Sequence, residues 1–158
     1  NTFSYSKYNS FSEDIVGAGK IYFSAIDGLG GDDVRLSKRR NLSGSRLRGF
    51  ERGKVGPLDG TDHIGGNYSA AVNFETNLPN LLPENTNTDV GLFLDFGNVW
   101  GVDYDSSIDD SNKIRSSFGA AVELLTPVGP LSFSLAQPIS KASTDKTETF
   151  RFQLGTTF

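Results

Sequence analysis

What this chain of 158 residues lacks or has little of limits what it can be. It has no cysteine, which excludes disulfides and thiolate metal sites. It has no run of about 18 apolar residues, which excludes a transmembrane helix. His63 is its single histidine, so neither a zinc site, which needs several His or Cys ligands, nor a histidine-based catalytic triad is expected. The hydrophobic fraction of 36% also lies below the range of about 45–50% of globular domains, and a soluble protein of this composition would have a thin core.

Methionine is absent as well, and the chain starts at Asn1, from which we expect a fragment or a processed product. The net charge of −4 argues against nucleic acid as a partner. Glycine and phenylalanine, by contrast, are abundant at 18 and 12 residues. This mixture favours strands and tight turns over helices.

Alternation of apolar and polar residues predicts an all-β chain of about seven strands. In the clearest strand, Phe118 and Val122 face one side while Ser117 and Glu123 face the other. Strands of about 9–11 residues suit a tilted crossing of a membrane. The predicted strands lie at about 2–9, 14–27, 65–78, 88–100, 113–125, 131–140 and 150–158.

The connections between these strands alternate in length. Outer-membrane barrels have this asymmetry, with short turns at one end and long loops at the other. Together with the periodicity it favours a transmembrane barrel, and it leaves a soluble β-sandwich or a lipocalin-like barrel as the alternative. The short turns are 10–13, 79–86 and 126–130, and the longer polar connections are 28–64, 101–112 and 141–147.

In such a barrel, arginine should be costly at lipid-facing positions such as Val72 and Leu94. At the inward-facing serines Ser69, Ser117 and Ser134, we expect the same substitution to be mild.

Other motifs do not support catalysis or metal binding. The segment 17–20 resembles a phosphate loop, but no Ser or Thr follows Lys20 and no helix begins there. The acids of the loop after residue 100 do not fit a calcium loop, because Ile108 and Ile114 stand where Gly and Glu are needed. We therefore expect a solvated acidic loop, no catalytic residue, no metal and no cofactor. The acids concerned are Asp103, Asp105, Asp109 and Asp110.

The long loop 28–64 carries the densest positive charge of the chain. Its part from Arg35 to Arg40 is expected to be solvated, with contact to anionic lipopolysaccharide as the alternative. Arg48 differs, because Gly49 permits a close backbone approach and Phe50 supplies an apolar anchor. The tip of this loop is therefore predicted to dock.

Two acidic residues are candidate partners for Arg48 at the tip of this loop. Glu75 and Asp95 lie on consecutive predicted strands, with the parity opposite to that of the lipid-facing residues. Both should point into the interior of the barrel, where an acid needs a partner.

Three stretches and the terminal strand resemble the Omp85 superfamily, and within it the BamA-type branch, the D15 surface antigens. The stretches are 47–50 (LRGF), 92–100 (LFLDFGNVW) and 126–138 (TPVGPLSFSLAQP). The resemblance implies that residues 1–158 form an antiparallel meander, the C-terminal part of a sixteen-stranded transmembrane β-barrel. It also implies that the N-terminal strands and the POTRA domains are absent from this sequence.

The same resemblance implies roles for individual residues. Leu47, Arg48, Gly49 and Phe50 would form a loop lock, in which Arg48 pairs with the interior acids Glu75 and Asp95. The terminal strand would act as an assembly signal and would pair weakly with the first barrel strand, forming a lateral seam. Its residues are Phe150, Phe152, Leu154, Gly155 and Phe158. Phe158 and Trp100 are also placed where interfacial aromatic girdles form.

A non-enzymatic function follows from the resemblance: folding and insertion of β-barrel proteins into the bacterial outer membrane. The implied partners are outer-membrane lipids and lipopolysaccharide, nascent outer-membrane barrel proteins and the lipoproteins of an assembly complex, without nucleic acid. The alternative within the superfamily is a TamA-like factor or a two-partner secretion transporter that moves polypeptides through the barrel. A soluble ligand-binding β-barrel is the third class, and solubility without detergent would distinguish it.

Overall fold

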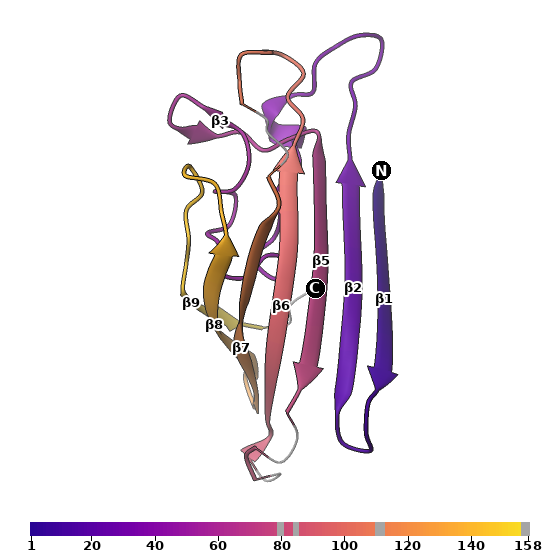
Figure 1. Cartoon of the computed structure of the whole chain (residues 1–158), viewed down its shortest axis with the longest axis vertical. Helices are drawn as coiled ribbons and strands as arrows, with labels where there is room; N and C mark the ends of the chain where they lie inside the picture. Colours follow the sequence, from indigo (N-terminus) through magenta and orange to yellow (C-terminus); the bar gives the residue numbers. More distant parts are fainter. Residues whose placement is uncertain (79–80, 84–85, 110–112, 156–158) are drawn as a thin grey trace.

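One antiparallel sheet of 7 strands dominates the structure, a computed structural model that describes residues 1–158 except 79–80, 84–85, 110–112 and 156–158. Each strand pairs with its neighbour along the chain, apart from the pairing of β2 with β5 across the long loop (Figure 1). The predicted all-β antiparallel meander is confirmed. The strands are β1 (Thr2–Ser10), β2 (Val16–Ala25), β5 (Tyr68–Asn77), β6 (Thr88–Trp100), β7 (Arg115–Thr126), β8 (Gly129–Ser140) and β9 (Phe150–Leu154).

The loop between β2 and β5 contains short regular elements that the sequence did not reveal. They are a 3₁₀ turn, η1 (Leu36–Lys38), and a small hairpin of β3 (Leu58–Asp59) with β4 (Asp62–His63). Elements of two or three residues are too short to show a period. Within the described residues, no helix is long and apolar enough to span a membrane.

Short and long connections lie at opposite ends of the sheet, as predicted (Figure 1). One short turn is tighter than the predicted 126–130, because Thr126 pairs with Gly129 across a two-residue turn. Gly129 has a φ of +121°, which residues with a Cβ rarely adopt. The predicted turn 79–86 lies partly outside the described residues.

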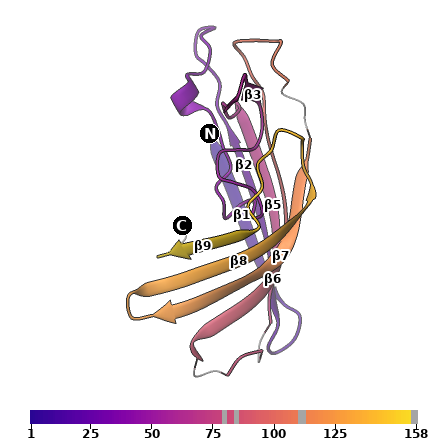
Figure 2. The ribbon, with the colours of Figure 1, turned by 90° about the vertical axis from the view of Figure 1, so that its left-hand side faces the viewer.

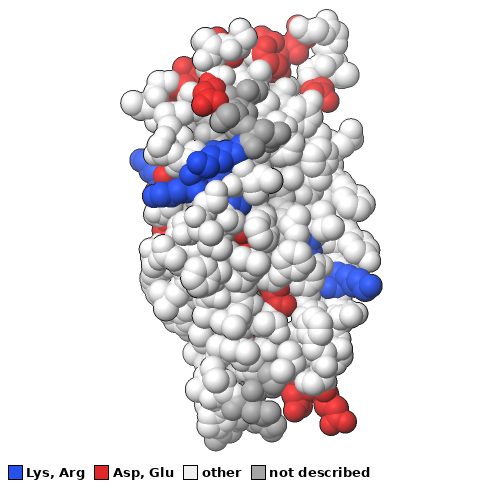
Figure 3. Space-filling view, viewed as in Figure 1, with Lys and Arg blue, Asp and Glu red and all other residues white. Residues whose placement is uncertain are grey.

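The convex face of the sheet is apolar because the register aligns apolar residues of successive strands. Phe74 lies opposite Leu94, and Leu94 lies opposite Phe118. Phe74 and Phe118 are each 51% exposed, although both are large and apolar. The face seen in Figure 3 is mostly uncharged across the strands. Such a continuous apolar surface fits the predicted contact with lipid.

The main apolar core lies on the concave face, between the sheet and the long loop. Figure 2 shows this loop on the inner side of the curved sheet. Ala71 of β5 and Val99 of β6 meet loop residues in one buried cluster, and Tyr22 packs against it. The apolar material of the chain is thus divided between a lipid-facing surface and a small core under the loop. The loop residues of the core are Leu42, Leu47, Phe50 and Val55.

This packing corrects the expectation that inward-facing serines tolerate arginine. Ser69 and Ser117 are both 0% exposed, because the loop covers the inner face where they lie. An arginine at either position would have to displace the loop, so it cannot be mild. Ser134 is half-buried, but it lies opposite Arg151. Ser132 is the better control, since it lies opposite Glu123 and Gln153.

Arginine at Val72, Leu94, Val122 or Phe133 should destabilise the membrane-inserted protein by about 2–4 kcal/mol for positions near the middle of the bilayer. The reason is that each side chain lies on the apolar convex face, where arginine loses its hydration. Urea titration of the full-length protein in lipid vesicles measures the cost. Ser132→Arg is the control and should cost much less, and equal costs for the two faces would show that the assignment is wrong.

Candidate functional site

The segment Leu47–Phe50, called the RGF segment below, is seated on the inner face by two apolar anchors. Leu47 and Phe50 are 1% and 2% exposed. Between them, Gly49 has a φ of +88°, and a Cβ at this position would lie 3.1 Å from Ala136 Cβ and 3.2 Å from Ser117 Cβ. The sequence correctly indicated both the close approach at Gly49 and the apolar anchor at Phe50.

The guanidinium of Arg48 binds Asp95 of β6 in a bidentate contact. Arg48 Nε donates to Oδ2 and Nη2 donates to Oδ1, each over 2.7 Å. The backbone N–H of Arg48 also donates to Oδ2 over 3.0 Å, and Asn73 Nδ2 donates to Oδ1 over 2.8 Å. The side chain of Asp95 is 0% exposed, so these donors replace the water that the carboxylate has lost.

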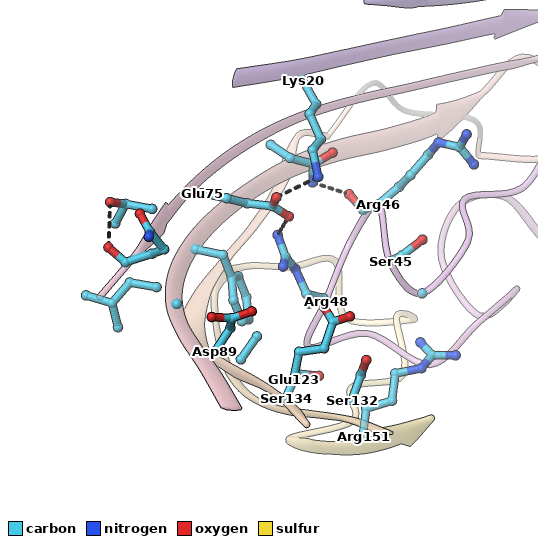
Figure 4. A pocket seen from close by; sticks show the side chains of 18 of the residues that line it. Lys20, Ser45, Arg46, Arg48, Glu75, Asp89, Glu123, Ser132, Ser134 and Arg151 are labelled. Carbon is cyan, nitrogen blue, oxygen red and sulfur yellow. Dashed lines mark hydrogen bonds and ion pairs between the residues drawn. The ribbon is translucent and has the colours of Figure 1, made fainter. Parts of the chain in front are cut away.

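Glu75 of β5 provides a second anion for Arg48. Arg48 Nη2 lies 2.8 Å from Glu75 Oε1, and Lys20 Nζ lies 2.6 Å from Glu75 Oε2 (Figure 4). The cluster therefore balances two cations with two anions, which lowers the cost of holding charge away from bulk water. Nothing in the sequence indicated this role for Lys20, because the pairing of β2 with β5 across a long loop has no local signal.

Arg48 also contacts two further positions on the sheet. Its guanidinium carbon lies 3.8 Å from the centre of the Phe93 ring, and its carbonyl oxygen accepts a hydrogen bond from Ser117 Oγ. Through these contacts one loop residue joins β5, β6 and β7. The contact predicted between Arg48 and Glu75 or Asp95 is present with both acids.

A second buried arginine corrects the expectation of a fully solvated stretch from Arg35 to Arg40. Arg39 is buried and donates to Asp103, Asn67 and the carbonyl of Val34. Asp103, expected in a solvated acidic loop, thus joins loop 101–114 to the long loop. Partial burial raises the pKa of Asp103, but hydrogen bonds from Asn67, the Val34 N–H and Arg39 outweigh this and lower it to about 2.

A third ion pair, between Arg115 of β7 and Asp145, is buried and was missed by sequence analysis. Arg115 Nε and Nη2 donate to the two carboxylate oxygens of Asp145 over 2.8 Å and 3.0 Å. Arg115 has the same parity as Ser117 along its predicted strand, which indicates that its side chain points inward. Asp145 lies in an aperiodic polar loop, so nothing in the sequence pointed to it.

Below the RGF segment, the concave face encloses a hollow of about 590 Å³. Asp89 and Glu123 lie directly opposite each other on β6 and β7 and contribute acids to its wall (Figure 4). Arg46 and Arg151 contribute cations. The lining therefore combines charged groups of both signs with apolar side chains such as Phe93. Among the described residues, no group of three His, Asp or Glu side chains could hold a metal ion.

The terminal strand β9 extends the sheet by five residues opposite Leu131–Leu135 of β8. Phe150, Phe152 and Leu154 are exposed on the convex face, and the rings of Phe133 and Phe152 lie 5.2 Å apart. Gly155 donates its N–H to the Pro130 carbonyl. Phe158 lies outside the described residues. Within the described part of the chain, the second edge of β9 pairs with no strand.

Comparison with known families matches residues 1–158 to the Omp85 superfamily domain. The chain belongs to the Omp85 superfamily. It is 34% identical over 139 residues to the outer membrane protein assembly factor BamA of Neisseria meningitidis serogroup B (strain ATCC BAA-335 / MC58). This alignment covers 71% of this chain and 17% of that protein. The BamA of Neorickettsia risticii (strain Illinois) is 31% identical over 147 residues, which covers 91% of this chain and 19% of that protein.

A solved structure shows the same arrangement of strands. The crystal structure of BamA from Haemophilus ducreyi lacking POTRA domains 1–3 matches 96% of this chain and 33% of that chain, with a TM-score of 0.85 and 28% identity. This Omp85 chain spans about a fifth or less of the curated relatives' length. The predicted family and the bacterial outer-membrane location are confirmed, and nothing in these matches supports a TamA-like or two-partner secretion protein.

Removing Arg48 or Asp95 should destabilise the seated loop by up to roughly 3–5 kcal/mol, the cost of an uncompensated buried charge. Glu75→Gln should cost less than Asp95→Asn, because the Glu75 side chain is 28% exposed whereas that of Asp95 is 0% exposed. A double-mutant cycle with Arg48→Ala and Asp95→Asn in the full-length protein measures their coupling. Denaturant titration with proteolysis of the loop as the readout gives the free energies.

The exposed Arg52 is the matched control in this loop, and Arg52→Ala should leave proteolysis unchanged. For the charge-reversed variant Arg48→Glu, partial rescue is expected from Glu75→Arg. Asp95→Arg should not rescue it, because that side chain would be fully buried. Additive effects of Arg48→Ala and Asp95→Asn would contradict the contact.

The Asp103 contact should weaken only in strong acid. Its pKa is about 2 in the folded protein against an ordinary 3.8. The contribution of Asp103 to stability is therefore complete above its ordinary pKa and is lost as the pH falls towards 2. Exchange of the Val34 amide, which donates to Asp103 Oδ2 over 2.8 Å, reports on this contact. Relative to its intrinsic rate, exchange should stay constant from pH 7 to about pH 4 and rise below that. The same profile in Asp103→Asn would contradict this assignment.

Proposed function

We propose that this chain is the C-terminal barrel region of an insertase that folds and inserts β-barrel proteins into the bacterial outer membrane. The observation that carries the proposal is likeness to two proteins named outer membrane protein assembly factor, one of them aligned with 91% of this chain. The seated RGF segment supports it, because both of its apolar anchors are buried and Arg48 binds two acids.

The proposed mechanism is physical rather than enzymatic. A nascent barrel protein in the membrane must satisfy its backbone N–H and C=O groups without water. An exposed strand edge can supply partners for these groups by β-augmentation. The second edge of β9 is the candidate in this chain, since it pairs with no strand among the described residues. Among the described residues, the ladder between β8 and β9 covers five residue pairs, and such a short ladder favours local opening.

In this mechanism the RGF segment maintains the contacts inside the sheet while the second edge of β9 pairs with a client strand. Arg48 joins β5, β6 and β7 from inside, so the loop stays seated over the inner face of the sheet. Loss of the contact should leave the strands paired but should slow assembly, since Arg48 takes no part in the ladders of β5 with β6 or of β6 with β7.

The proposed partners follow from the two faces of the sheet. The apolar convex face fits outer-membrane lipids, with lipopolysaccharide at the end that carries the long loops. Nascent outer-membrane barrel proteins would be the clients. Lipoproteins of an assembly complex would bind the full-length protein, and the POTRA domains would lie N-terminal to this region.

The test uses the full-length protein with Arg48→Glu introduced into the chromosomal gene. Outer-membrane barrel proteins should fall several-fold in folded amount, because the reversed charge repels Asp95 and Glu75. Folded and unfolded clients are separated by their heat-modifiable mobility in SDS gels. Arg52→Glu makes the same charge change at an exposed position of the same loop and should have little effect.

Reconstitution gives the direct measurement. Vesicles that contain the full-length protein should fold an added, urea-unfolded barrel protein faster than empty vesicles do. Equal rates with and without the protein would refute the proposed function. Equal activity of the Arg48→Glu and Arg52→Glu variants would remove the RGF segment from the mechanism.

A further inference from the structure

The ion pair of Arg115 with Asp145 is the most deeply buried charge pair outside the Arg48 cluster among the described residues. The two side chains are 4% and 0% exposed. Arg115 also donates to Asn98 of β6 and to the carbonyl of Lys113. Asp145 additionally accepts the N–H of Ala142 over 2.6 Å. The pair thus attaches segment 141–149 to β7 and β6, at the point where that segment crosses the inner face.

The anchored segment is bound directly to the RGF segment. Glu148 donates its N–H to the Gly49 carbonyl over 3.0 Å, and Glu51 donates to the Lys146 carbonyl over 2.9 Å. Lys146 in turn donates to the Lys54 carbonyl over 3.1 Å, and Phe50 forms a β-bridge with Thr147. Residues 49–54 and 146–148 therefore lie side by side like two antiparallel strands.

Segment 141–149 also leads directly into β9, which begins at Phe150. The carbonyl of Thr149 accepts the N–H of Ala136 in β8 over 2.8 Å, which fixes where β9 enters the sheet. Thr144 of the same segment contacts the long loop at a second place, since its carbonyl oxygen lies 3.0 Å from His63 Nε2. A single short segment therefore contacts the RGF segment, the outer part of the long loop and the start of the terminal strand.

We propose that Arg115 and Asp145 are positioning residues that couple the seating of the RGF segment to the start of β9. With the pair intact, residues 146–148 present backbone partners to residues 49–54 and hold Thr149 against β8. When the pair is broken, both contacts loosen together. The consequence for assembly rests on the proposed function, because β9 supplies the edge that a client strand would use.

Coupling of this kind must be reciprocal, because each site changes the stability of the other by the same free energy. Asp145→Asn should therefore speed hydrogen exchange in residues 49–54, and Arg48→Ala should speed it in residues 145–149. Loss of a buried charged hydrogen bond predicts an acceleration of about tenfold or more in each direction. Residues 150–154 should also exchange faster in both variants.

The experiment is hydrogen exchange by mass spectrometry on the full-length protein in lipid nanodiscs. Asp62→Asn is the matched control, since it changes an exposed acid of the long loop and should alter neither segment. Arg115→Lys keeps the charge but loses the planar fork, so it should give a smaller acceleration in the same segments. It also supplies the measurement if Asp145→Asn does not insert.

Acceleration confined to residues 141–149 in the Asp145→Asn protein would overturn the inference, since the pair would then only shape its own loop. Exchange needs no assembly activity, which separates the two proposals. A flat response in residues 49–54 together with normal assembly would refute only the coupling. If the variants show the expected exchange response but the unsubstituted protein folds no client, only the proposed function would be refuted.

Discussion

The structure depends on a carboxylate, Asp95, that is fully removed from solvent on the inner face of the sheet. A charge in that position is stable only when donors replace its water, and three of the donors come from Arg48. Asn73 supplies the fourth. Because Arg48 lies in the loop between β2 and β5, satisfying Asp95 brings that loop onto the sheet. Leu47 and Phe50 then reach the small core with Ala71 and Val99.

The division of apolar residues explains how a chain with a low hydrophobic fraction can fold. Strand alternation places one set of apolar side chains on the convex face, where they contact lipid instead of a protein core. The inner face carries polar side chains and is covered by a loop whose cations match its anions. Three arginine–carboxylate pairs tie the loops to the sheet or to each other: the buried pairs Arg48–Asp95 and Arg115–Asp145, and Arg39–Asp103, in which only the arginine is buried. Exposed ion pairs would add little, whereas buried ones fix geometry.

Sequence reasoning recovered the strands, their order and the inward direction of Glu75 and Asp95, because alternation along a strand is a local property. It also indicated Gly49 and Phe50 as docking residues, and the family resemblance supplied the pairing of Arg48. It did not assign Lys20, Arg39, Asp103 or Asp145, whose partners lie 30 or more residues away in the chain. Such contacts depend on sheet register and on loop paths, which leave no periodic signal. The serines Ser69 and Ser117 were misjudged for the same reason, since only the seated loop buries them.

If the Arg48 contact holds the long loop on the inner face of the sheet, the distance between this loop and β7 is fixed only while that contact is present. This region contains no cysteine, so spin labels can be attached at Arg52→Cys in the loop and Lys113→Cys beside β7, both at exposed positions. Pulsed electron paramagnetic resonance of the full-length protein in nanodiscs then gives the distribution of distances between the labels. A loop held by Arg48 gives one narrow distribution when Arg48 is present and a broad one with Arg48→Ala. Identical distributions in the two proteins would show that Arg48 does not hold the loop in place.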